Sequence, residues 1–224
     1  MLAGHYGVAY ALRVGRPQTR LWHLFLAVQA TDIAFSALAI AGIETLRINP
    51  AGRGPLSLEL VSLPYTHSLL MTVAYGATCM LVGAVAGRLA AGVVLGAAVI
   101  SHWLLDAIVH VRDLPLAPWL PPSVGLGLWQ MPLVGLALEL GLLTGGYLWL
   151  RRSLTSPARH RADLCFALLV VVELVYTFQP APSGIVRASA GAEVIYVVAI
   201  LLAAAVDRAA GRAHAPAITA SVQG

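Results

Sequence analysis

Residues 89–110 read LAAGVVLGAAVISHWLLDAIVH, a mostly apolar run that begins directly after Arg88. Its second half carries three ionisable side chains, those of His102, Asp106 and His110. A bilayer core about 30 Å thick takes about 20 helical residues, so the run is long enough to cross a membrane as one helix. Ionisable side chains inside a bilayer cost about 2.5 to 3.5 kcal/mol each and are usually kept for a function. The run therefore predicts a transmembrane helix that contains a polar site.

Apolar segments of similar length lie on both sides of this run. They predict an all-α protein, a polytopic transmembrane helix bundle with about six full spans, at residues 21–46, 67–87, 89–110, 126–150, 162–178 and 189–207. The first 13 residues are apolar but too short to cross alone, so we expect a half-span helix packed against the bundle. We interpret residues 1–208 as a single transmembrane domain and residues 209–224 as a flexible C-terminal tail.

The composition excludes an ordinary soluble enzyme. Of the 224 residues, 59% are hydrophobic and only 11% are charged, whereas soluble domains carry about 25% charged residues. The 14 basic residues are all arginines and stand singly or in pairs between apolar segments, which indicates contact with lipid head groups and no nucleic-acid partner. Cys79 and Cys165 lie inside apolar segments without CxxC spacing, so we expect free, buried thiols.

The distribution of the arginines predicts the orientation of the bundle. If six spans alternate, one face of the membrane receives ten arginines and the other receives four, at positions 47, 53, 112 and 187. By the positive-inside rule the first face is cytoplasmic, which places the protein in the cell (inner) membrane with its C-terminus in the cytoplasm. The connections 47–66 and 111–125 then lie outside, and their many Pro and Gly residues predict ordered turns or caps.

Polar residues on three predicted spans lie at related depths. His102 and Asp106 are four residues apart and therefore share one side of their helix. Depth in the membrane is counted at 1.5 Å per residue from the arginines at the cytoplasmic surface. On this count four residues lie about 18 to 31 Å above that surface, in the outer half of the membrane: Asp32, His67, His102 and Asp106. His5 comes out lower, at about 12 Å, and joins the others only if the short helix is tilted or begins deep.

This set of side chains is typical of a metal site. Histidine and aspartate ligands without a thiolate suit zinc first, with manganese or iron as alternatives. A bound divalent metal would lower the pKa of a bound water molecule, and Asp32 or Asp106 would serve as ligand or catalytic base. The alternative interpretation is that each of these residues only forms hydrogen bonds between helices.

Four short motifs resemble those of the YdjM-type family of membrane-bound, metal-dependent hydrolases. They stand here, in the family's order, as Gly4-His5, Thr31-Asp32-Ile33, Thr66-His67-Ser68 and Ser101-His102-Trp103-Leu104-Leu105-Asp106, followed by Pro115 and Pro118. The resemblance covers roughly residues 1–120. It implies hydrolysis of an ester or phosphoester, with His5, Asp32, His67, His102 and Asp106 as metal ligands.

The sequence departs from the family pattern after Asp32. The family has a second acid and a histidine there, whereas this chain has Ala34 and Phe35. The departure favours one metal over two, and His110 is a candidate replacement for a missing ligand.

Other acidic residues have alternative interpretations. Glu139 and Glu173 lie near the middle of their predicted spans. One interpretation is functional, with each carboxylate on a proton path or facing the site. The other is that each forms hydrogen bonds between helices. We expect Glu44 to pair with Arg47 at a helix end, and Arg112 to pair in the same way with Asp113.

We favour an integral membrane hydrolase that acts on a small amphipathic or lipid-linked ester. The second hypothesis is a metal-ion or proton transporter that uses the same cluster. It needs polar residues reaching both faces of the membrane, and few are found below Asp32. A membrane scaffold with a structural metal is the third.

Overall fold

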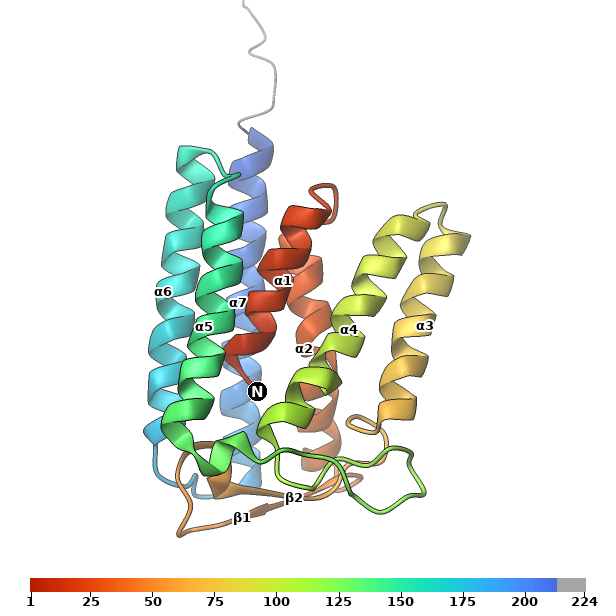
Figure 1. Cartoon of the computed structure of the whole chain (residues 1–224), viewed down its shortest axis with the longest axis vertical. Coiled ribbons are helices and arrows are strands. Elements are labelled where there is room, and N and C mark those ends of the chain that lie inside the picture. The colour runs from red at the N-terminus through yellow and green to blue at the C-terminus, as the bar shows by residue number, and fades with distance from the viewer. Residues whose placement is uncertain (213–224) are drawn as a thin grey trace, which may run out of the picture.

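The computed structural model describes residues 1–212, and within that range it consists mainly of a helical bundle (Figure 1). The seven α-helices are α1 (Ala3–Gly15), α2 (Leu21–Ile40), α3 (Leu69–Val85), α4 (Leu89–Val109), α5 (Pro132–Arg151), α6 (Ser156–Phe178) and α7 (Ile185–Arg212). Two short 3₁₀ helices, η1 (Gly54–Ser57) and η2 (Leu128–Gln130), lie in the connections. The predicted all-helical bundle is confirmed.

Four helices, α2, α4, α5 and α7, are long and apolar enough to cross a membrane. The predicted number of about six spans is therefore not confirmed, since four of the described helices have the length and apolarity of a span. Helix α3 has 17 residues and is shorter than a typical span. Helix α6 has 23 residues but carries Arg159, Arg161 and Asp163 near its start and Glu173 further along, so its apolar part is interrupted.

A β-hairpin replaces the end of the first predicted span. Helix α2 ends at Ile40, and the chain turns at Gly42, whose φ of 72° lies in the left-handed region that glycine adopts without strain. Strand β1 (Thr45–Ile48) then pairs antiparallel with β2 (Leu58–Ser62). The predicted boundary at residue 46 was wrong because the apolar side chains of β1 resemble a helix in composition. The expected cap in the connection 47–66 is this hairpin, and we call the end of the bundle that carries it the hairpin end.

The boundary at the other end of the domain also differs from the prediction. Helix α7 continues to Arg212, so residues 209–212 belong to the helix and not to a tail. The remainder of the predicted flexible tail, residues 213–224, lies outside the described residues.

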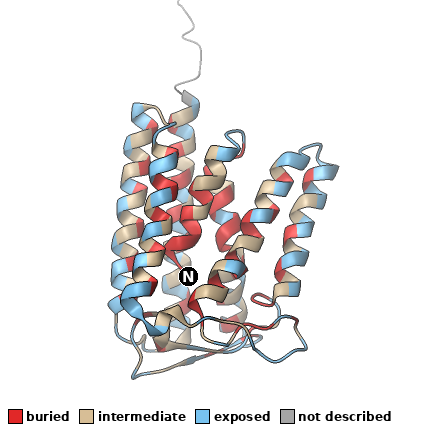
Figure 2. Ribbon diagram, in the orientation of Figure 1, coloured by how far each residue is buried: buried red, intermediate tan, exposed pale blue. Residues whose placement is uncertain are grey.

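Helix α1 lies in the middle of the bundle, and its N-terminus is inside the protein (Figure 1). Figure 2 shows that the buried residues concentrate on α1 and on the faces of the helices around it. Tyr6 and Tyr10 are fully buried there and pack on Phe25 of α2. Both cysteines are free, as predicted; Cys165 is buried near these tyrosines, whereas Cys79 is half-buried and not buried as expected. Helix α1 has 13 residues, whereas α2 and α4 have 20 and 21. Because α1 is shorter, its first residues lie at the level at which α2 and α4 carry their polar side chains.

Helix α3 lies at the edge of the bundle and packs on α4 (Figure 1). The backbones approach closely at Gly83 and Gly92, where a Cβ on either residue would lie within 3.0 Å of the other's Cα. The two helices therefore pack closely against each other within the bundle at these glycines. The segment before α3, which carries His67, is held next to α4 by a hydrogen bond of 2.8 Å from Trp103 Nε1 to the carbonyl oxygen of His67.

Candidate metal centre

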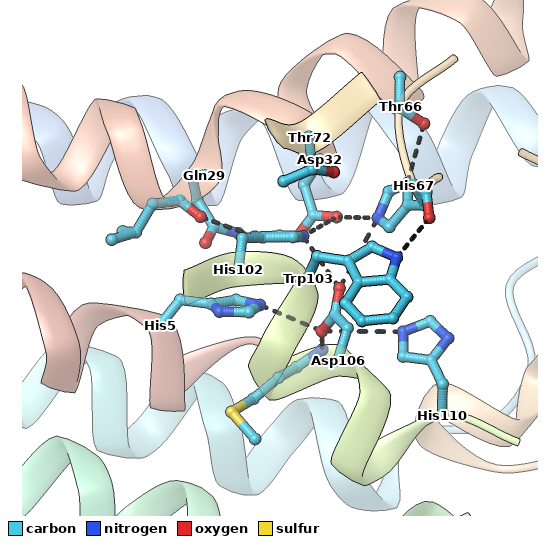
Figure 3. Close-up of polar contacts among 12 residues, drawn as sticks. His5, Gln29, Asp32, Thr66, His67, Thr72, His102, Trp103, Asp106 and His110 are labelled. Carbon is cyan, nitrogen blue, oxygen red and sulfur yellow. Dashed lines mark hydrogen bonds and ion pairs between the residues drawn. The ribbon is translucent and has the colours of Figure 1, made fainter. Parts of the chain in front are cut away.

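Four side chains from three parts of the chain converge inside the bundle (Figure 3). Asp32 comes from α2, His102 and Asp106 come from α4, and His67 comes from the turn before α3. One ligand atom from each residue lies within 4.8 Å of those of the other three. Three of the four residues are buried, and Asp32 is 18% exposed. This cluster can hold a metal ion.

The orientation of His67 is fixed by a chain of hydrogen bonds that begins at Glu44. The buried Glu44 carboxylate accepts the backbone N–H groups of Tyr65 and Thr66 at 2.8 and 3.0 Å. It also accepts the Thr66 hydroxyl group at 2.5 Å. Because that hydroxyl has only one proton, its oxygen must accept the proton of His67 Nδ1, which lies 2.8 Å away. We therefore assign the Nδ1–H tautomer to neutral His67, which leaves a lone pair on Nε2.

The same tautomer follows for His102 and His110. His102 Nδ1 lies 2.7 Å from the backbone carbonyl oxygen of Val28, which can only accept a proton. His110 Nδ1 lies 3.0 Å from a carboxylate oxygen of Asp113. Hydrogen bonds of this kind commonly orient metal-binding histidines. All three imidazoles thus turn Nε2 towards the carboxylates of the cluster.

The distances between these donor atoms fit a single small cation. His67 Nε2 lies 3.1 Å from Asp32 Oδ1 and 3.8 Å from Asp106 Oδ2. His102 Nε2 lies 3.5 and 2.9 Å from the same two atoms. Ligands in a tetrahedral zinc site with bonds of about 2.1 Å are about 3.4 Å apart. Within residues 1–212, the buried atoms His102 Nε2 and Asp106 Oδ2 have no hydrogen-bond partner, and a cation bound between them would satisfy both.

His5 and His110 lie beside this cluster, on the other carboxylate oxygen of Asp106. His5 Nε2 is 3.2 Å and His110 Nε2 is 3.8 Å from Asp106 Oδ1. The His5 ring also stacks on the ring of His102, with 3.9 Å between centroids. The Met1 amino group donates to the same oxygen at 2.6 Å. Asp106 therefore joins the four-residue cluster to a second polar group.

The depth estimate for His5 was too low because Arg13 is itself partly inside the protein. Its side chain is 17% exposed, and its guanidinium lies 3.8 Å from the Asp207 carboxylate on α7. Counting the depth of His5 from Arg13 therefore assumed a surface position that this side chain does not have.

Two expected ion pairs are not formed. Glu44 bonds to the turn around Thr66, as described above, and its pairing with Arg47 was a wrong prediction. Asp113 bonds to His110 where a pair with Arg112 was expected. In both cases the carboxylate bonds to a histidine or to the residue next to one, and sequence neighbours alone give no sign of that. Glu44 is the residue of the site that sequence analysis missed.

Glu139 and Glu173 support the N-terminus of α1. Glu139 accepts the backbone N–H of Leu2 at 2.7 Å, and Glu173 accepts that of Ala3 at 3.2 Å. The first N–H groups of a helix lack partners within the helix, and carboxylates satisfy them and complement the helix dipole. Of the two earlier interpretations, hydrogen bonding between helices describes these contacts, although the donors are main-chain groups.

A cavity of about 520 Å³ connects the cluster with the hairpin end. Asp32, His67 and His110 line it at one end, and its walls are mostly apolar side chains of the hairpin and α7. Asp106 does not line it. The cluster is thus accessible to a small or elongated ligand through Asp32 and His67.

The fold and the site together define a helical membrane-type bundle with a buried histidine and aspartate cluster that can hold a metal ion. No family model, curated protein or solved structure matches this chain.

The contacts of Glu44 predict a loss of metal affinity for the Glu44→Gln variant. A glutamine has one acceptor oxygen where the carboxylate has two, so the Thr66 hydroxyl loses its acceptor and His67 loses its fixed tautomer. We expect metal affinity to fall about 10- to 100-fold, as measured by competition with a chromogenic chelator. Glu59→Gln, at an exposed position of β2, is the control and should bind metal as the wild type does. Equal affinities of both variants would contradict the role of Glu44.

Proposed function

We propose that the protein is an integral membrane hydrolase that uses one divalent metal ion to cleave an ester or phosphoester of an amphipathic or lipid-linked substrate. The observation that supports this most strongly is the convergence of two histidine lone pairs and two carboxylates at the inner end of an apolar cavity. The four motifs shared in order with the YdjM-type hydrolases support the same reaction class.

The ligands of the metal are Asp32, His67, His102 and Asp106, with His5 and His110 next to them on Asp106. Zinc suits this donor set first, and manganese or iron are the alternatives. Such an ion supplies a bound water of lowered pKa and polarises the carbonyl or phosphoryl oxygen of a substrate.

The two aspartates have different parts in this proposal. Asp106 is 1% exposed and is surrounded by the Met1 amino group, His5 and His102, so it holds ligands in place. Asp32 is 18% exposed and lines the cavity, where it can accept a proton from a water molecule next to a substrate. Gln29 donates to its other oxygen at 3.0 Å and Tyr196 at 3.4 Å, which orients the carboxylate.

The proposed placement in the membrane follows the arginines. About six helices, α2 to α7, would cross the inner membrane, with α1 as a half-span helix. The hairpin end, with four arginines, would face outwards and the C-terminus would face the cytoplasm. A substrate from the outer leaflet then reaches the cavity without crossing the bilayer.

The function is tested by assaying the purified protein on chromogenic carboxyl esters and phosphoesters with and without a chelator. We expect hydrolysis of at least one class, its loss to background after chelation, and its recovery with zinc, manganese or iron. The Asp32→Asn variant should bind metal more weakly than the wild type, because Asp32 is also a ligand, and at saturating metal it should hydrolyse at least 100-fold more slowly, as loss of a catalytic base usually causes. Failure to hydrolyse any ester, combined with metal uptake into proteoliposomes, would replace the hydrolase by the transporter.

A further inference from the structure

Arg187 is a cation at the mouth of the cavity that leads to the cluster. It lies in the first turn of α7, is exposed, and lines the same cavity as Asp32, His67 and His110. Among the described residues its guanidinium has no hydrogen-bond or ion-pair partner. An arginine with free donors beside a binding cavity is suited to hold an anion, because its planar fork matches the oxygens of phosphate or carboxylate.

Arg187 also lines a second, open groove between strand β1 and the start of α7. Among the residues that the structure describes, Arg187 and Arg47 are the only charged ones that line this groove. Its remaining surface is largely apolar and includes Ile48, Val186 and Val194, of which the two valines are more than 60% exposed. A surface that combines two cations with exposed apolar side chains, at the end of a helix long enough to span a membrane, fits an anionic amphiphile.

We infer that the ligand of this cavity is a membrane lipid whose phosphate group binds Arg187 at the mouth, while its ester-bearing part extends towards the cluster. The inference deepens the proposed function and rests on it for the identity of the reacting group. It assigns Arg187, with Arg47 nearby, as the residue that selects anionic over neutral lipids.

The order of the groups along α7 supports this assignment. Arg187 precedes Tyr196 by nine residues, which is about 14 Å along a helix axis, and the Tyr196 hydroxyl donates to Asp32. An anion at Arg187 is therefore a different group from the one that reaches Asp32. In a phospholipid the phosphate lies at the membrane surface and the carboxyl esters lie deeper, which is the order of Arg187 and the cluster from the hairpin end inwards.

The test measures lipid binding by metal-free protein, so that its result does not depend on hydrolysis. Dihexanoyl phosphatidic acid, dihexanoylglycerol and inorganic phosphate are titrated into chelator-treated protein in a neutral detergent. Binding is followed by tryptophan fluorescence, since Trp129 lines the cavity. We expect Arg187→Gln to bind phosphatidic acid about tenfold more weakly and to bind dihexanoylglycerol as the wild type does. Arg187→Lys should retain part of the affinity, because the charge remains and the fork is lost.

The matched control is Arg112→Gln. Arg112 is an exposed arginine in the connection after α4, at the hairpin end, and it does not line the cavity or the groove. The Arg112→Gln variant should bind phosphatidic acid with the same affinity as the wild type. Equal weakening in both variants, or none in Arg187→Gln, would overturn the inference even if the protein hydrolyses esters. Inorganic phosphate that binds as tightly as phosphatidic acid would show that the anion is free phosphate and overturn the lipid assignment.

Discussion

Replacing His102 and Asp106 together by alanine is expected to remove bound divalent metal almost completely. The two residues supply two of the four converging ligand atoms, at 2.9 Å from each other, and Asp106 also contacts His5 and His110. The remaining Asp32 and His67 form a two-ligand site, which holds a divalent ion weakly. Wild-type protein purified without chelator should contain about one metal ion per chain, and the double variant should contain close to none.

The measurement is elemental analysis by plasma mass spectrometry, with protein quantified by amino-acid analysis. The matched control is the double variant His160→Ala, Asp163→Ala, which removes a histidine and an aspartate from the far end of α6, outside the cluster. It should keep the wild-type metal content. Wild-type protein without stoichiometric metal, or equal metal in the two double variants, would refute the metal site.

Gly146→Ala is expected to destabilise the bundle and to disturb the site from a distance. A Cβ on Gly146 of α5 would lie 2.0 Å from the backbone oxygen of Gly7 and 2.8 Å from its carbonyl carbon. Those are backbone atoms of α1, so α1 itself must move away. Overpacking of this kind costs about 1 to 3 kcal/mol, or roughly 2 to 10 °C in Tm for a chain of this size. A displaced α1 carries His5 and Met1 away from Asp106, so metal affinity should fall as well.

The adjacent Gly145→Ala is a close control for this substitution. It lies in the same helix, and an added Cβ there would have no atom within 4 Å. Its Tm and metal content should match or slightly exceed those of the wild type, because alanine favours the helix over glycine. The measurement is thermal unfolding in one detergent with metal content determined in parallel. If the two variants unfold at the same temperature, α1 and α5 are not in backbone contact at this point.

Much of the site could be predicted from local sequence. His102 and Asp106 are four residues apart in an apolar helix, and helical geometry alone places them on one face. Asp32 and His67 could be added to this predicted site because their counted depths in the membrane are similar to those of His102 and Asp106, and residues at similar depth can meet inside a small bundle. His5 was placed too low because its depth was counted from Arg13, whose partly buried position results from packing against α7.

Other features could not be read from the residues next to them. Glu44 and the Thr66 hydroxyl are 22 residues apart and meet because the hairpin folds back over the end of the bundle. The end of α2 was also misjudged, since β1 continues the apolar composition of the helix while pairing with β2.

The sequence by itself determined that the chain forms apolar helices and that certain histidines and aspartates lie inside them. Those properties depend on length, hydropathy and hydrogen bonds within a few residues, which a single segment can satisfy alone. Only the tertiary structure decided which lone pairs face each other, which proton each imidazole carries and which cavity reaches them. These depend on contacts between residues far apart in the chain, such as Met1 with Asp106 and Gly7 with Gly146, and so on how closely the helices pack.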